Sequence, residues 1–160
     1  MEPVHLRPFS PADADWVISR HGAIYAAEEG FDARFEALVA DIVAAFVARH
    51  DPVREAGWIA EREDRRVGSI FVVIEDAKTA KLRLVLLEPD QRGTGLAQRM
   101  LETAMDFARA AGFTRMRLWT HESHIAAGRL YARNGFRCTQ SEVKQSFGQD
   151  VVSQIWERDL

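Results

Sequence analysis

The chain has 160 residues, 47% apolar and 28% charged, which is enough to bury the core of one globular domain. Its formal charge of −3 offers no basic excess for a nucleic-acid backbone, and no apolar run approaches the roughly 18 residues that span a bilayer. The single Cys138 excludes an internal disulfide and a cysteine-based zinc cluster. We therefore expect no nucleic-acid or membrane partner. We also expect a cytoplasmic location, because the N-terminus lacks the layout of a signal peptide.

The first half of the chain alternates between helical and strand patterns. From residue 32 the apolar positions recur at steps of three and four, which predicts an amphipathic helix that Asp51-Pro52 ends. Pro11 begins an earlier helix, which we expect His21-Gly22 to end or break. The expected elements are a strand at residues 4–9, helices at 11–20 and 32–51, and consecutive antiparallel strands at 57–62, 67–74 and 81–87.

The second half predicts a helical crossover between two strands. An apolar helical face ends at Gly112, which favours the left-handed backbone found just after a helix. Ser123 is expected to cap the next helix and Asn134-Gly135 to close it. The expected elements are a helix at 96–111, a strand at 115–120 parallel to the strand at 81–87, a helix at 123–133, and strands at 136–144 and 150–158. Without a linker or repeat, residues 1–160 are expected to form one mixed α/β domain.

The stretch from residue 82 to 111 carries the clearest functional signal. An apolar strand leads through Glu88-Pro89-Asp90 into Gln91-Arg92-Gly93-Thr94-Gly95-Leu96-Ala97, which opens a helix. Such a turn presents free backbone N–H groups at the positive end of a helix dipole, with Arg92 beside them. This predicts an anion-binding turn, and we expect the anion to be a pyrophosphate. A P-loop would need Gly-Lys-Ser/Thr at residues 95–97, and a dinucleotide fold a third glycine at Gln98.

Two motifs and the order of elements resemble the GCN5-related N-acetyltransferases. Residues 91–97 are similar to the family's Q/R-x-x-G-x-G/A acetyl-CoA loop, and residues 130–136 to its L-Y-x-x-x-G-F signature. The resemblance implies a mixed, mainly antiparallel sheet with one parallel, splayed strand pair, flanked by helices. It also implies acetyl-CoA as co-substrate, no metal, and direct acetyl transfer to a primary amine in a ternary complex. Residues 21–25 and 31–42 further resemble acetyltransferase domains fused behind MarR-type repressor domains, of which this would be a stand-alone or excised version.

The resemblance also implies which residues bind acetyl-CoA. The backbone at Val85 and Leu87 would pair with the pantetheine arm like an added strand, usually beside a bulge, and the Leu87 N–H would face the thioester oxygen as an oxyanion donor. The expected pyrophosphate ligands are the backbone N–H groups of Arg92, Gly93, Thr94, Gly95, Leu96 and Ala97. The alternative for this loop is a structural strand-to-helix turn with an incidental arginine.

His124, Ala127 and Tyr131 are spaced by three and four residues, so they share one helix face. Tyr131 matches the family tyrosine that often acts as general acid toward the departing sulfur, for which a phenol is a suitable proton source. The alternative is a half-buried tyrosine that packs the core through its ring. His124 stands where the family commonly has an asparagine that reaches the pantetheine, and an exposed histidine without a role is the alternative.

The general base is less well defined, because any carboxylate, histidine or water chain can take the proton of an amine. We rank His121 and Glu29 first, although most of the candidate acids are expected to be ordinary surface charges. The other candidates are Glu28, Glu75, Asp76 and Glu122. No covalent intermediate is implied, since Cys138 is expected to be a small buried residue in a strand.

The sequence leaves the acceptor open. A small-molecule or peptide amine is expected, with specificity set by residues 24–32 and the loop near Phe147. The charge of −3 leans slightly toward cationic amines but discriminates little, because most amine substrates are cations. The late strands are a plausible place for contacts in a homodimer. Two alternative functions are a non-catalytic acyl-CoA-binding or sensing module and a general nucleotide-binding protein.

Overall fold

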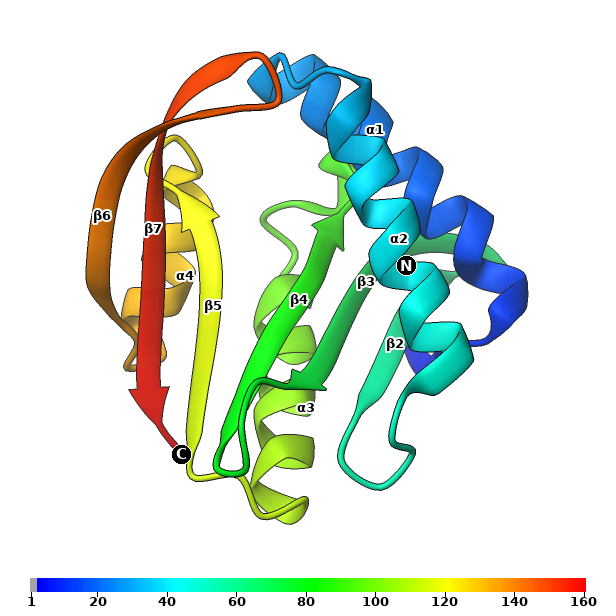
Figure 1. Cartoon of the computed structure of the whole chain (residues 1–160). Helices are drawn as coiled ribbons and strands as arrows, with labels where there is room; N and C mark the ends of the chain where they lie inside the picture. Colours follow the sequence, from blue (N-terminus) through cyan, green and yellow to red (C-terminus); the bar gives the residue numbers. More distant parts are fainter. Residues whose placement is uncertain (1–2) are drawn as a thin grey trace.

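A computed structural model describes residues 3–160 and shows a seven-stranded sheet in the order β1-β2-β3-β4-β5-β7-β6 (Figure 1). Every neighbouring pair is antiparallel except β4 and β5. The mixed α/β fold with one parallel pair is therefore confirmed. The elements are β1 (His5–Pro8), α1 (Ala14–Glu29), α2 (Ala33–Arg49), β2 (Ala56–Arg62), β3 (Arg65–Ile74), β4 (Thr79–Leu87), α3 (Leu96–Ala110), β5 (Arg115–His121), α4 (Ile125–Arg133), β6 (Arg137–Ser146) and β7 (Gln149–Asp159).

The sheet separates two apolar cores. Helices α1 and α2 cover one face, where Val39 and Val43 pack with Ile59 and Phe71 of the sheet. Helices α3 and α4 lie on the other face and pack with a second set of strand residues that includes Leu82. Alternate residues of a strand point to opposite faces, so β2, β3 and β4 contribute to both cores.

Helix α1 is longer than the sequence predicts. It passes through His21 and Gly22 without a break and ends at Gly30, which has φ +71°. The buried His21 ring bonds the Val17 carbonyl one turn earlier, Nδ1 to O, at 2.7 Å. A side chain at Gly22 would collide with Glu36 of α2, so this glycine allows a close approach of the two helices. Tertiary packing thus overrides the expected stop.

Two further expectations are wrong. Helix α4 starts at Ile125, and Ser123 does not cap it, because the Ser123 hydroxyl donates to Glu29 Oε2 at 2.8 Å. Cys138 is exposed, since β6 is an edge strand with hardly any covering on either face.

Strands β4 and β5 diverge after a short parallel contact. They pair only where residues 79–81 meet residues 115–117, so the edge of β4 beyond Lys81 has no strand partner within residues 3–160. On its other edge β4 carries a bulge, because Ser69 pairs with Leu86 while Phe71 pairs with Arg83. Leu84 in this bulge has φ +52°, and its carbonyl accepts a 2.7 Å bond from the Ser69 hydroxyl. The divergence opens a cleft through the middle of the sheet.

Candidate active site

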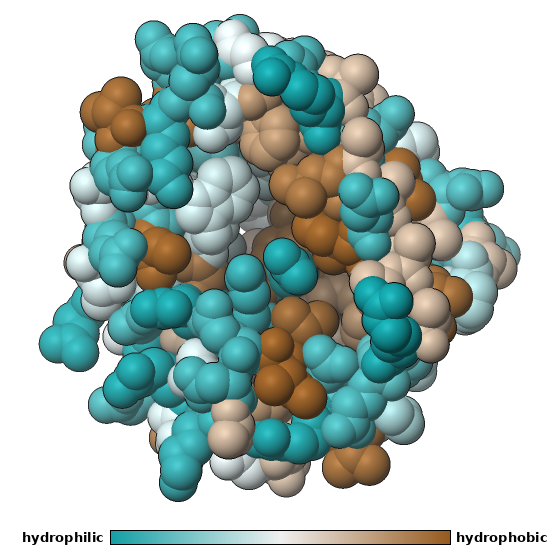
Figure 2. Space-filling view, in the orientation of Figure 1, coloured by the Kyte–Doolittle hydropathy of each residue, from teal (hydrophilic) through white to brown (hydrophobic). Residues whose placement is uncertain are grey.

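A cavity of about 400 Å³ fills the space between the diverging strands. Its walls come from α1, α2, β4, β5, α4 and the β6–β7 hairpin, so segments from most of the chain meet there. The face drawn in Figure 2 is hollowed near its centre, with apolar residues gathered along one side. The cavity lining includes Val85, His121, His124 and Tyr131, which the sequence had already singled out.

The glycine-rich turn follows β4 and sets the start of α3. Gly93 has φ +74° and Gly95 has φ +83°, a region where side chains are strained. Among residues 3–160, no atom beyond the adjoining residues lies within 4 Å of the place where a Cβ would stand on either glycine, so the space beside the turn is open. The first helix bond runs from the Arg99 N–H to the Gly95 carbonyl at 3.2 Å. The amides before Arg99 in the first turn of α3 have no partner within the helix and can bind an anion.

Two side chains of this turn make contacts within the protein. The Arg92 guanidinium pairs with Glu28 of α1, Nη1 to Oε1, at 2.6 Å, so it ties the turn to α1. The Thr94 hydroxyl donates to the Gln91 carbonyl at 2.6 Å. With these two side chains engaged, the backbone N–H groups are the part of the turn that remains available to an anion.

Tyr131 of α4 and His124, the residue just before this helix, both line the cavity. Tyr131 is 5% exposed, and its ring packs 5.7 Å from the ring of Phe136, centre to centre. Burial raises the pKa of Tyr131 to about 12, so its hydroxyl keeps its proton at neutral pH. His124 contacts Glu29 of α1, Nε2 to Oε1, at 3.0 Å. The carboxylate of Glu29 therefore fixes the orientation of the His124 ring.

His121 and Glu29, ranked together from the sequence, differ in position. His121 lines the cavity at 2% exposure, and neither ring nitrogen has a hydrogen-bond partner within residues 3–160. Burial lowers the pKa of His121 to about 4, so the ring is neutral at physiological pH and offers a free lone pair. Glu29 does not line the cavity, because it lies behind His124 and also accepts the Ser123 bond.

The remaining expected residues lie outside this cavity. Glu28 is paired with Arg92, as described above. Leu87 lies further along β4 toward the glycine-rich turn. The other acids considered as bases, Glu75, Asp76 and Glu122, do not line the cavity.

A roof of aromatic rings covers one end of the cleft, and sequence reasoning missed most of it. We define the roof as Tyr25, Phe31 and Phe35 of the α1–α2 region together with Phe147 of the β6–β7 turn. The Phe147 ring lies 5.0 Å from Phe31 and 5.1 Å from Phe35, centre to centre. The Asp32 N–H also donates to the Phe147 carbonyl at 3.0 Å. Both segments were expected to influence specificity, but the sequence gives no signal that they touch.

His21 was also missed, because its Gly22 neighbour suggested a helix end. It lines the cavity at 2% exposure, and its Nε2 has no hydrogen-bond partner within the described residues. Burial lowers the pKa of His21 to about 4. The cleft thus contains two neutral buried histidines, His21 and His121.

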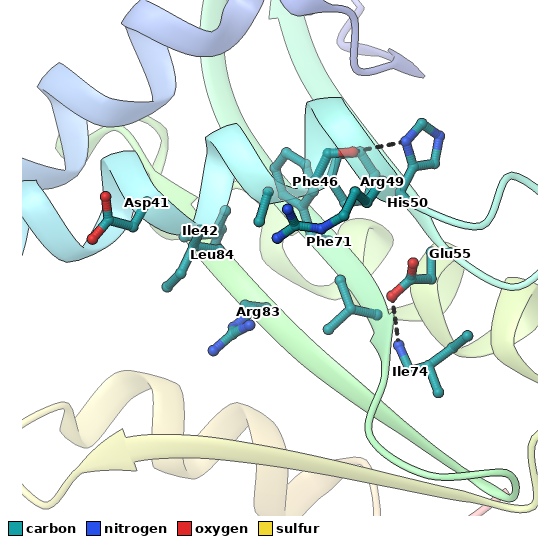
Figure 3. A pocket seen from close by; sticks show the side chains of 12 residues that line it. Asp41, Ile42, Phe46, Arg49, His50, Glu55, Phe71, Ile74, Arg83 and Leu84 are labelled. Atoms are coloured by element: carbon teal, nitrogen blue, oxygen red, sulfur yellow. Dashed lines mark hydrogen bonds between the residues drawn. The ribbon is translucent and has the colours of Figure 1, made fainter.

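A second cavity of about 400 Å³ lies between α2 and strands β3 and β4 (Figure 3). Phe46 and Phe71 contribute to its apolar lining, and Asp41 and Arg49 bring charges to it from α2. It shares Arg83 and two apolar residues with the first cavity, so the two are continuous along β4.

Within residues 3–160, no group of three or more His, Cys, Asp or Glu side chains is placed to hold a metal ion. No helix in the same part of the chain is long and apolar enough to cross a membrane.

Known proteins with similar sequences are acetyltransferases. A model of the acetyltransferase (GNAT) family matches residues 23–136. Human N-acetyltransferase 8B is 31% identical over 87 residues, which are 51% of this chain and 38% of that protein. Mycothiol acetyltransferase of Beutenbergia cavernae is 29% identical over 70 residues, 44% of this chain and 24% of that protein. The chain thus matches less than half the length of these curated relatives.

Solved structures share the fold over the whole chain. An acetyltransferase from Streptococcus agalactiae has a TM-score of 0.82 and 24% identity, with 100% of both chains covered. The protein yncA from Salmonella typhimurium, solved with its cofactor acetyl-CoA, has a TM-score of 0.76 and 16% identity and covers 98% of this chain and 94% of its own. Identities this low show a common fold and leave the substrate open.

Proposed function

Because this chain belongs to the acetyltransferase (GNAT) family, in which acetyl-CoA is the acyl donor, we propose that residues 1–160 form one domain that acetylates a primary amine in a ternary complex. The observation that carries the proposal is the free edge of β4, which runs from the cleft to the glycine-rich turn. One continuous segment thus offers backbone groups both to an extended arm and to a pyrophosphate.

The residues present fit acetyl-CoA, which supplies an activated acetyl thioester. The turn at residues 92–97 holds the pyrophosphate with backbone N–H groups, and the open space beside Gly93 and Gly95 lets it approach closely. The β4 backbone at Val85 and Leu87 binds the pantetheine arm as an added strand. The Leu87 N–H stabilises negative charge on the thioester oxygen. His124, held by Glu29, donates one further hydrogen bond to the arm.

Two cavity residues handle protons on opposite sides of the reaction. The nitrogen of the neutral amine would form a bond to the acetyl carbon as the carbon–sulfur bond breaks. The proton that this nitrogen loses once the bond forms passes through a hydrogen bond to His121 toward solvent, because a ring whose pKa is about 4 does not retain it. Tyr131 donates its proton to the departing sulfur and regains one from water. Glu29 orients His124 and does not itself take the proton of the amine, so it is a positioning residue and not the general base.

Two measurements test the proposal. Calorimetric titration should show binding of acetyl-CoA and no comparable binding of ATP or NAD. CoA release should then increase when members of an amine panel are added. Acetyl-CoA binding without amine-dependent CoA release would leave a non-catalytic binding protein, and preference for ATP or NAD would reject the cofactor assignment.

A further inference from the structure

Two cations on β4 line the cleft, and within residues 3–160 neither has a partner of opposite charge. Lys81 and Arg83 are alternate residues of the strand, so they project to the same face. Both line the cavity, both are half-buried, and neither forms an ion pair or a side-chain hydrogen bond within residues 3–160. Arginine and lysine are seldom removed from water without a partner, because desolvating a charge is costly. This pair therefore suggests a site for an anion.

Neighbouring charges leave the pair positive. Arg117 of β5 stands nearby, but its guanidinium already bonds Glu157 and approaches Glu75 at 3.5 Å. Glu75 attracts both Lys81 and Arg83 through space without pairing with either. Burial lowers the pKa of Lys81 and of Arg83, which shows the cost of holding these charges without a counter-ion.

Four more charged residues, two of each sign, border the cavities around the pair. Asp41, Arg49 and Glu55 line the neighbouring cavity that contains Arg83, and Lys144 of β6 lines the cleft itself. Their formal charges cancel, so the excess at Lys81 and Arg83 remains.

The pair lies on the side of the sheet opposite Tyr131. Leu82, between the two cations, points into the core with α3 and α4, to which Tyr131 also belongs. Lys81 and Arg83 therefore project toward the face covered by α1 and α2, and Arg83 lines the cavity beside α2 that Figure 3 shows. Arg83 directly precedes the Leu84 bulge, at the point where an amine would meet the free edge of β4.

We propose that the acceptor amine also carries a carboxylate, and that Arg83 and Lys81 bind this carboxylate so that the amine faces the bulge. The proposal rests on the acetyl transfer proposed above and names the class of substrate: amino acids and related amino carboxylates. The planar guanidinium fork of arginine matches a carboxylate through two parallel hydrogen bonds. Lys81 adds a point charge to the same site. The overall charge of −3 therefore does not describe the local field in the cleft.

The experiment uses pairs of ligands that differ only in the carboxylate. L-amino acids and their carboxamides are compared for CoA release with acetyl-CoA, and for binding by calorimetry to the protein saturated with CoA. The acid should be preferred over its amide by about 10- to 100-fold, as expected for the loss of one charge-assisted hydrogen-bonded contact. Arg83→Gln should abolish this preference, and Lys81→Met should reduce it. The affinity for acetyl-CoA should stay unchanged in both variants.

Matched substitutions control for the loss of a charge. Lys78→Met removes a lysine three residues from Lys81 in the exposed β3–β4 turn, and Arg137→Gln removes an exposed arginine of β6. Both should keep the preference for the acid. Arg83→Lys provides a second variant that keeps the charge and loses the fork, so it should retain part of the preference even if Arg83→Gln folds poorly.

Each outcome decides the proposal. Equal use and binding of acids and amides, binding of neither, or a preference that survives in Arg83→Gln would overturn it. Tighter binding of aminophosphonates than of the matched acids would overturn the choice of a carboxylate. If acids bind selectively but no amine releases CoA, the proposed acetyl transfer fails while the anion site stands. If amines release CoA but acids are not preferred over their amides, the proposed acetyl transfer stands and the carboxylate site fails.

Discussion

The glycine-rich turn and the aromatic roof border the same cleft but are built in different ways. The turn is continuous in sequence, and it acts through backbone N–H groups whose positions follow from Gly93 and Gly95. The roof joins segments 119 positions apart, where the Gln149 amide bonds the Gly30 carbonyl, and it acts through side chains. A backbone site can therefore be found in one stretch of sequence, whereas a side-chain site depends on the tertiary fold. Substitutions in the two regions should affect different ligands.

The largest effect is expected at the turn. Gly95→Val should weaken acetyl-CoA binding by roughly 1,000-fold, because a β-branched residue at φ +83° is strained and shifts N–H groups that each contribute about 1.5–3 kcal/mol to a charged acceptor. Gly112→Val is the matched control. It places the same side chain at φ +92° at the other end of α3, with equally open surroundings. It should lower stability without changing the affinity measured by calorimetry, and similar losses of affinity in both variants would contradict the assignment.

Acid should destabilise the cleft beneath the roof before it affects other parts of the fold. The pKa of His21 is about 4 in the folded protein and about 6.5 when unfolded, so the unfolded chain binds more protons between these values. The free energy of unfolding should fall as the pH drops from 6.5 to 4, by about 3 kcal/mol from His21. His121 contributes in the same direction.

Urea unfolding at several pH values measures this loss. His21→Asn should remove much of the dependence in this window. The pKa of Asp13 is held well below its usual range, chiefly by the Arg7 guanidinium, so its contribution is lost only below about pH 4. A flat stability profile from pH 6.5 to 4 would show that the histidines are not buried as described.

Tyr131→Phe should separate chemistry from binding. Removing the proton donor should lower kcat by about 100-fold, the usual range for general acid catalysis. The affinity for acetyl-CoA should hardly change, because the ring still packs against Phe136. Steady-state kinetics and calorimetry on the same preparation measure both quantities. An unaffected kcat would leave Tyr131 as a core residue only.

The smallest effect is expected at the roof. Phe147→Ala removes one ring from the cluster and should raise KM for the acceptor by about 10-fold, the loss expected for part of an aromatic contact. Acetyl-CoA affinity should stay the same. Val143→Ala truncates a 76% exposed residue of the same hairpin and should change neither quantity. A change in acetyl-CoA affinity alone would show that the roof covers the cofactor.

The sequence predicts what depends on near neighbours. The strand, turn and helix at residues 82–111 match a local pattern of apolar period and glycines, and the amphipathic α2 is equally clear from its spacing. The length of α1 could not be predicted, because the glycine that suggests a break instead allows Glu36 to approach from the next helix. The exposure of Cys138 depends on which strand lies at the sheet edge. Topology determines this, and strand propensity does not.

Among the site residues, too, the sequence predicts what near neighbours determine and misses what the tertiary fold determines. The spacing of His124 and Tyr131 predicts a shared helix face, and both line the cavity. That Glu29 lies behind His124 depends on how α1 meets α4, which no pattern in either segment encodes. Lys81 and Arg83 have the alternating pattern of any half-exposed strand. Only the fold shows that neither has an ion-pair partner within residues 3–160, because Arg117 lies opposite Lys81 and β5 diverges from β4 beyond it.

The bulge in β4 makes the shape of the cleft depend on Ser69, a residue of β3 that does not line the cleft. Leu84 adopts a backbone conformation that costs about 1–3 kcal/mol for a residue other than glycine, and the Ser69 hydroxyl on β3 holds it there. Selection for thermal stability alone would favour substitutions that relax this strain and straighten the strand. Such variants would melt at higher temperature while the gap between β4 and β5 narrows. A screen for robust variants of this protein should therefore retain Ser69 and monitor turnover together with the melting temperature.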